Sequence, residues 1–126
     1  MNVAAGDTKS VLIVDDDASL RQMLCWAFED MGYFTWGAGD SASAIDAVRG
    51  LSFSFALVDY HLPDGDGLTL MQLLKSYAPR LRSVMMSADP SIVAAALGFR
   101  KAPVTFFEKP VPILKIDRLF MKAMPA

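Results

Sequence analysis

The sequence contains only one cysteine, Cys25, so no intrachain disulfide can form. A chain without disulfides suits a reducing cytosol. Cys25 stands between Leu24 and Trp26, and unpaired cysteines in apolar surroundings usually behave as small hydrophobic residues. We therefore interpret Cys25 as a structural residue and not as a redox centre.

The chain also lacks a long apolar run. No segment approaches the ~20 consecutive apolar residues that a transmembrane helix requires. The first ten residues, MNVAAGDTKS, contain no signal-peptide core, and we expect residues 1–10 to form a short flexible lead-in. The sequence thus predicts a cytoplasmic protein that does not enter a membrane.

Neither sign of charge dominates, because 12 Lys and Arg residues stand against 14 Asp and Glu, giving a net charge of -2. This balance gives no reason to expect direct nucleic-acid binding, which usually needs a basic face. The acidic residues are unevenly placed: Asp15–Asp17 are consecutive, and Asp59, Asp64 and Asp66 follow later. The length of 126 residues and the 53% apolar content predict one folded domain with its own core.

Apolar periodicity predicts alternating strands and helices. We expect strands at 11–14, 33–36, 53–58, 83–86 and 104–107, and helices at 18–31, 41–49, 68–77, 90–99 and 113–124. The unbroken apolar run 11–14 is typical of a strand buried on both faces. Asp40 or Ser41, and Asp89, are expected to cap helices. Five such units predict an α/β domain with a mainly parallel sheet and helices on both faces.

Polar residues follow the predicted strands, at the sheet edge where ligands bind in such folds. They are Asp15–Asp17, Asp59, Ser87 and Lys109. Clustered carboxylates need a compensating cation, and a few oxygen ligands favour Mg²⁺. A carboxylate can attack phosphorus to give an acyl phosphate, while an ammonium group and a hydroxyl stabilise the transferring charge. The sequence therefore predicts a Mg²⁺-assisted phosphoryl acceptor at this edge.

Four motifs in their order and spacing resemble one family. VLIVDDD at 11–17, ALVDYHLPDGDG at 56–67, MMSA at 85–88 and FFEKP at 106–110 together resemble the receiver domains of bacterial two-component response regulators. The resemblance covers residues 11–124, with no output domain expected in this chain. It implies a flavodoxin-like, doubly wound, five-stranded parallel sheet in the order 2-1-3-4-5, with five helices.

The resemblance also implies the roles of the acidic residues. Asp59 matches the aspartate that is phosphorylated. Asp16 matches the direct Mg²⁺ ligand, with Asp15 helping directly or through water and Asp59 completing the carboxylate set. His61 would give its backbone carbonyl to the metal. Lys109 matches the lysine that pairs with the phosphoryl group.

The resemblance implies a conformational switch as well. Ser87 matches the Ser/Thr that moves to bond a phosphoryl oxygen, and Phe106 matches the aromatic residue that swings inward when it does. The Lys109–Pro110 peptide bond is expected to be cis, which proline permits. The chain would then act as a signalling switch that catalyses only its own phosphorylation and dephosphorylation.

Some positions depart from the usual receiver pattern. His61 stands where many receivers carry Met, Asn or Lys, and with Asp89 it is expected to influence water attack and hence the lifetime of the phosphoryl group. Ala102-Pro103 replaces a common Gly-Ala step, and Pro103 removes a backbone donor before the last strand.

The family resemblance also implies which proteins this chain interacts with. It implies phosphoryl donation by a sensor histidine kinase or a histidine phosphotransfer protein. It also makes a homodimer possible, through the fourth helix, fifth strand and fifth helix expected at 90–99, 104–107 and 113–124.

Three other functions fit parts of the sequence. Asp15 and Asp17 also resemble the nucleophile and acid/base of haloacid-dehalogenase-like phosphatases, although Asp17 is equally suited to capping a helix. A receiver that no longer accepts phosphate and serves only as an interaction module is the second alternative. The third is a flavin-binding protein, which would need a phosphate-binding loop rich in Ser, Thr and Gly where this chain has three aspartates.

Overall fold

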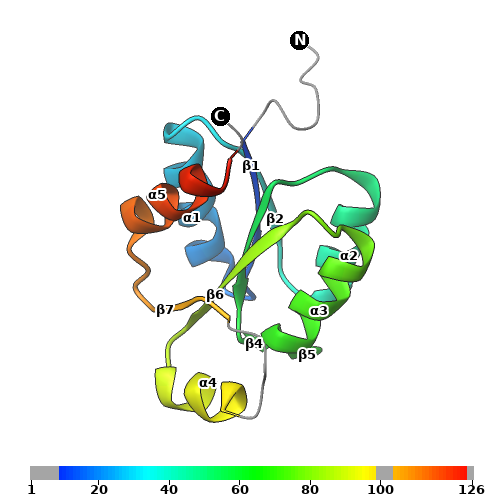
Figure 1. The fold of residues 1–126 in the computed structure, drawn as a ribbon, viewed down its shortest axis with the longest axis vertical. Helices are drawn as coiled ribbons and strands as arrows, with labels where there is room; N and C mark the ends of the chain where they lie inside the picture. The colour runs from blue at the N-terminus through cyan, green and yellow to red at the C-terminus, as the bar shows by residue number, and fades with distance from the viewer. Residues whose placement is uncertain (1–8, 99–103, 125–126) are drawn as a thin grey trace.

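The computed structural model describes residues 9–98 and 104–124. One parallel sheet forms its centre, made of β1 (Ser10–Val14), β2 (Phe34–Ala38), β3 (Phe55–Asp59), β6 (Arg82–Ser87) and β7 (Phe106–Glu108). Their order across the sheet is β2-β1-β3-β6-β7 (Figure 1). Counting these strands along the chain gives 2-1-3-4-5, so the predicted topology is confirmed.

Among the described residues, five helices surround the sheet: α1 (Ala18–Asp30), α2 (Ser41–Gly50), α3 (Gly67–Tyr77), α4 (Pro90–Leu97) and α5 (Ile113–Ala123). Figure 1 shows α1 and α5 on one face and α2 and α3 on the other, with α4 near the lower end of the sheet. This is the doubly wound arrangement that the alternating pattern predicts. Within the described residues, no helix is long and apolar enough to cross a membrane.

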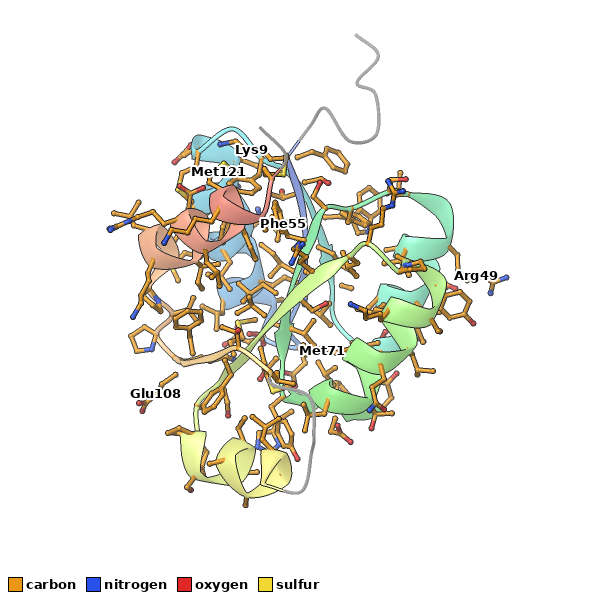
Figure 2. The ribbon with its side chains drawn as sticks, viewed as in Figure 1. Lys9, Arg49, Phe55, Met71, Glu108 and Met121 are labelled. Atoms are coloured by element: carbon orange, nitrogen blue, oxygen red, sulfur yellow. The ribbon has the colours of Figure 1, made fainter. Side chains whose placement is uncertain are left out.

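Alternate residues of the strands supply the two main cores. On the side of α1 and α5, Val11, Ile13 and Phe55 pack with Phe28 and Phe120. Figure 2 shows Phe55 inside the fold, whereas Arg49 projects away from α2. The opposite core lies against α2 and α3, and its buried members are Leu12, Val14, Ala38, Ala44, Ala47, Phe53, Ala56, Val58, Leu70, Leu74 and Leu81. Since successive side chains of a strand point to opposite faces, burial on both faces explains the continuous apolar runs.

Four aspartates begin four helices. Asp17, Asp40, Asp66 and Asp89 each accept a hydrogen bond from a backbone N–H in the first turn of the following helix. Such caps satisfy donors that the helix itself leaves unpaired. The capping expected of Asp40 and Asp89 is therefore confirmed. Asp17 is a cap as well, in agreement with the capping interpretation of this residue.

Several boundaries differ from those expected. The loop after β3 contains a short antiparallel hairpin, β4 (His61–Leu62) with β5 (Gly65–Asp66), which the Pro/Gly-rich sequence did not reveal. Strand β3 begins at Phe55 and not at residue 53. Phe53 lies in the loop before the strand, and its side chain is buried there by stacking on Phe34. Strand β7 begins at Phe106, the first residue in register with β6.

Some expectations fall outside the described residues. These are most of the lead-in at 1–10, the end of the fourth helix at residue 99 and the effect of Pro103. Strand β1 begins at Ser10, one residue earlier than expected, because Ser10 pairs with Phe34 of β2.

Tyr33 ties α5 to the start of β2. Its hydroxyl donates to an Asp117 carboxylate oxygen at 2.6 Å, and its ring, 4% exposed, packs edge-on against Phe28. Burial, followed by the bond to Asp117, raises the pKa of Tyr33. We expect Tyr33→Phe to keep the ring packing and to lower the free energy of unfolding by about 1.5–3 kcal/mol, the scale of a hydrogen bond to a charged group. Urea denaturation of the variant and the wild type measures this difference, and equal stabilities would contradict it.

Candidate functional site

The carboxyl ends of four strands bring the predicted site residues together. Asp15 follows β1, Asp59 ends β3, Ser87 ends β6 and Lys109 follows β7. Asp15, Asp59 and Ser87 are buried, at 0%, 4% and 0% exposure. Parallel pairing aligns these strand ends, because Asp59 is opposite Met86 of β6. The neighbouring Ser87 is in turn opposite Glu108 of β7.

Lys109 bridges two of the carboxylates. Its Nζ lies 2.8 Å from Asp15 Oδ2 and 2.9 Å from Asp59 Oδ2. These are the only ion pairs within residues 9–98 and 104–124. Charge-assisted bonds of this length are strong, and the three groups span strands β1, β3 and β7. The ammonium group therefore stands directly beside the Asp59 carboxylate.

The pKa values of Asp59 and Lys109 are both raised, but for different reasons. Burial raises the pKa of Asp59 and the charge on Asp15 raises it further, whereas the hydrogen bond from Lys109 lowers it, and the net direction is upward. Burial alone would lower the pKa of Lys109, but its bonds to Asp15 and Asp59 outweigh this, and that pKa is raised. A single ammonium group therefore does not fully offset the cost of burying the Asp59 carboxylate next to the negative charge of Asp15.

Asp15, Asp16 and Asp59 form the one acidic cluster of the described chain in which three ligand atoms lie within 4.8 Å of one another. Asp16 is exposed, whereas the other two residues are buried. A set of oxygen ligands with one side open to water fits a hard divalent cation that keeps some of its waters. The surplus of negative charge beside Lys109 fits such an ion as well.

The loop that follows Asp59 is held tightly against the site. The N–H of His61 donates to Asp59 Oδ1 at 3.3 Å, and the N–H of Gly67 donates to the Tyr60 carbonyl at 2.7 Å. A Cβ atom at Gly67 would lie 2.4 Å from the carbonyl oxygen of Asp59 and 2.9 Å from the Cα of Tyr60. Only glycine allows this approach without a backbone shift.

Asp64 holds the same loop from the other side. Its two carboxylate oxygens accept from the backbone N–H groups of Ser41 at 2.8 Å and Ala42 at 3.1 Å, at the start of α2. These bonds, the one from Ser41 above all, lower the pKa of Asp64. Neither Asp64 nor Asp66 joins the acidic cluster, although both are close to Asp59 in sequence.

Ser87 and Phe106 lie beside the site without contacting its charged groups through any hydrogen bond described. The Ser87 hydroxyl accepts from the N–H of Asp89 at 3.0 Å and donates to the Asp89 carbonyl at 3.1 Å. Phe106 is half-buried against the small core of Leu68, Met85 and Val93. The Lys109–Pro110 peptide bond is cis, as expected.

His61 and Asp89 both lie near the site, because the His61 N–H bonds to Asp59 and the Asp89 backbone bonds to the Ser87 hydroxyl. The side chain of His61 is exposed, and its ring lies 5.0 Å from that of Tyr60. The carboxylate of Asp89 caps α4, and the bond from the Ser91 hydroxyl at 2.6 Å is the main cause of its lowered pKa. The nearby His61 lowers that pKa as well, as the smallest of the causes.

Sequence reasoning missed two supporting residues. One is Asp64, which lies in the turn between β4 and β5 and whose partners lie at the start of α2. The other is Arg21, whose guanidinium donates to the backbone carbonyl of Asp15 at 2.7 Å. Glycines within a strand signal close approach of another group, and Gly37 and Gly39 lie against the Arg21 side chain. That signal was present in the sequence.

Comparison with known proteins gives a family-level match. The sequence profile described as "Response regulator receiver domain" matches residues 11–120. The probable transcriptional regulatory protein TcrX of Mycobacterium tuberculosis is 30% identical over 116 residues, which make up 92% of this chain and 50% of that protein. The DNA-binding response regulator MtrA of the same organism is 33% identical over 100 residues, 79% of this chain and 43% of that protein. The chain thus spans about half the length of these relatives.

Solved structures share the fold. A CheY-like response regulator receiver domain protein from Methanospirillum hungatei is 23% identical, with a TM-score of 0.80 over 92% of this chain and 96% of that one. A response regulator from Burkholderia pseudomallei, crystallised with a phosphorylated aspartic acid, a calcium ion and citrate, is 24% identical, with a TM-score of 0.77 over 94% of this chain and 67% of that one.

Proposed function

Because this chain belongs to the response regulator receiver domain family, we propose that Asp59 accepts a phosphoryl group in a Mg²⁺-dependent reaction. The donor is the phosphohistidine of a sensor histidine kinase or a histidine phosphotransfer protein. One observation carries the proposal: the Lys109 ammonium lies 2.9 Å from Asp59 Oδ2 at the strand edge where the three carboxylates gather.

The transfer is a nucleophilic displacement at phosphorus. A carboxylate oxygen of Asp59 forms the new O–P bond, and the P–N bond of the phosphohistidine breaks with its electron pair left on the imidazole nitrogen. With the other ring nitrogen protonated, the leaving group is neutral imidazole. Lys109 meets the charge of the transferring phosphoryl oxygens at a fixed position.

Asp15, Asp16 and Asp59 would hold the metal, with the backbone carbonyl of His61 as a further ligand. Mg²⁺ supplies neutralisation of the phosphoryl oxygens and of the carboxylates themselves. Asp15 is immobilised by hydrogen bonds to its backbone and its side chain. Asp16, exposed to solvent, is free to adjust to the ion. The residues therefore divide into fixed and adaptable ligands.

Phosphorylation then shifts the conformation. The phosphoryl group adds about -1.5 to -2 charges near pH 7, by analogy with other phosphorylated side chains. In our proposal Ser87 exchanges its bonds with the Asp89 backbone for one to a phosphoryl oxygen, and Phe106 turns inward into the space released. The output is a shift in a pre-existing balance between two states.

Two further residues set how long the signal lasts. His61 and Asp89 stand where a water molecule would approach the phosphoryl group, and they influence its attack. Backbone hydrogen bonds tie both residues to the strand ends, His61 to the Asp59 carboxylate and Asp89 to the Ser87 hydroxyl, which supports this role.

The output surface consists of α4, β7 and α5. Ile92, Leu114 and Leu119 expose 40%, 66% and 38% of their surface there, which supports a partner face or a homodimer contact. In this proposal the protein works in the cytoplasm as a switch, and it turns over no substrate other than its own phosphoryl group.

A phosphorylation assay tests the proposed function. The protein is incubated with acetyl phosphate, with and without Mg²⁺, and its intact mass is measured. We expect a gain of one phosphoryl group in the wild type and in Asp46→Asn, an exposed control on α2. We expect no gain in Asp59→Asn or without Mg²⁺. A phosphoryl group that remains in Asp59→Asn would refute the assignment of the acceptor, and a wild type without any gain would favour an interaction module that is not phosphorylated.

A further inference from the structure

Arg21 is half-buried on α1 and has no carboxylate partner among the described residues. It lies in the first turn of its helix, where the helix dipole disfavours a positive charge. Its guanidinium Nη1 instead donates to the carbonyl oxygen of Asp15 at 2.7 Å. Since the positive charge does not stabilise its own helix, its contact with the Asp15 carbonyl is the interaction to explain.

The sheet is shaped to admit this side chain. A Cβ atom at Gly37 would lie 3.1 Å from Arg21 Cδ, 3.2 Å from Cγ and 3.3 Å from Nε. One at Gly39 would lie 3.2 Å from Nη1. Neither glycine has a positive φ angle, so backbone conformation does not require glycine at positions 37 and 39. They leave room for Arg21 to run along the edge of β2 toward the end of β1.

The carbonyl that Arg21 holds belongs to the peptide joining Asp15 to Asp16. Because a peptide unit is planar, fixing its oxygen fixes the direction in which the chain continues to Asp16. The other side of Asp15 is already held, since its N–H donates to the Ala38 carbonyl at 3.0 Å and its side chain accepts from Lys109. Asp16, in contrast, is exposed, and its backbone runs from this peptide to Asp17, whose N–H donates to Asp15 Oδ1 at 2.9 Å.

We propose that Arg21, seated between Gly37 and Gly39, is a positioning residue that aims Asp16 at the divalent-cation site by holding the Asp15–Asp16 peptide. The inference rests on the proposed function, because it assumes that the carboxylate cluster binds Mg²⁺. It differs from a packing role, in which Arg21 only covers the sheet edge. A packing role would affect stability and leave metal affinity unchanged.

Mg²⁺ affinity, measured by titration calorimetry without a phosphodonor, separates these roles. We expect Arg21→Gln to bind Mg²⁺ about 10-fold more weakly, as for other residues that support metal ligands, and to shift the amide signal of Asp16 in ¹H–¹⁵N spectra. Arg80→Gln removes the same charge from an exposed turn and should bind Mg²⁺ as the wild type does. Unchanged affinity in Arg21→Gln would overturn the proposal.

Gly37→Ala tests the geometry while keeping the charge, and it serves if Arg21→Gln does not fold. Its methyl group displaces the Arg21 stem, so we expect weaker Mg²⁺ binding in the same direction. The double variant should stay within about 2-fold of Arg21→Gln, because both changes break one interaction. Normal affinity in Gly37→Ala, or additive losses, would count against the inference. A wild type that binds no Mg²⁺ would instead contradict the proposed function, and this inference with it.

Discussion

Gly67→Ala is expected to destabilise the protein by about 2–3 kcal/mol, toward the upper range for overpacking in a rigid site. The added methyl group would lie 2.4 Å from the Asp59 carbonyl oxygen and 2.9 Å from the Tyr60 Cα. Both are backbone atoms that cannot rotate away. The end of β3 must therefore move, and with it the acceptor side chain. Phosphorylation by acetyl phosphate should slow in the same variant.

Gly50→Ala is the matched control for this change. No atom lies within 4 Å of a Cβ at Gly50, which is the last residue of α2. Alanine there should be neutral or stabilise by about 0.4–1 kcal/mol through the unfolded state. Urea denaturation of both variants gives the comparison. If Gly67→Ala were as stable as Gly50→Ala, the contact between this glycine and β3 would not be rigid.

Lys109→Met should be the most damaging change to the charged site. It leaves Asp15 and Asp59 buried without their shared ammonium group. Removing one partner of a fully buried pair costs about 3–5 kcal/mol, and we expect about 2–3 kcal/mol here, because the 18% exposure of the Lys109 side chain admits some water. Transfer to Asp59 should also fall by at least about 10-fold, which corresponds to about 1.4 kcal/mol in the barrier.

The loss in Lys109→Met should depend on pH. Burial and Asp15 already raise the pKa of Asp59, and removing Lys109 takes away an influence that lowers it. A carboxyl group with a raised pKa in the folded state stabilises the fold at low pH and loses that contribution as the pH rises through its folded pKa. The deficit of the variant should thus be largest at about pH 7 and shrink toward about pH 4, near the unfolded pKa.

Denaturation at the two pH values, with Lys75→Met as an exposed control on α3, checks this expectation. Added Mg²⁺ should recover part of the stability of Lys109→Met at about pH 7, since the ion replaces the missing positive charge. A deficit that is the same at both pH values would mean that the variant loses packing and not charge compensation.

Much of the fold could be predicted because each level of the sequence agrees with the others. Strands buried on both faces appear as apolar runs, and aspartates and Pro90 mark the starts of helices. The ends of the strands were less predictable, because hydrogen bonding to the neighbouring strand decides where a strand begins. Phe53 is apolar and buried without joining β3, and the β4–β5 hairpin is too short for a periodic pattern.

The charged centre of the site was also predictable, because strand ends in a parallel sheet must converge. Asp15, Asp59 and Lys109 meet there although 94 residues separate the first from the last. The supporting residues were not predicted. Arg21 and Asp64 bond to backbone groups, so no side chain of opposite charge marks their partners. Asp64 anchors the loop after Asp59 to the start of α2 and takes no part in the acidic cluster.

The bonds of Asp64 have a consequence for how this sequence can evolve. Its carboxylate accepts hydrogen bonds from the backbone N–H groups at positions 41 and 42, and every amino acid except proline supplies such a group. Mutations there can accumulate on the outer surface of α2 while the loop beside the acceptor stays anchored. Related sequences would then share an acid at position 64 and vary freely at position 42, whose contact is made by the backbone, so covariation between these two positions would reveal nothing of the contact.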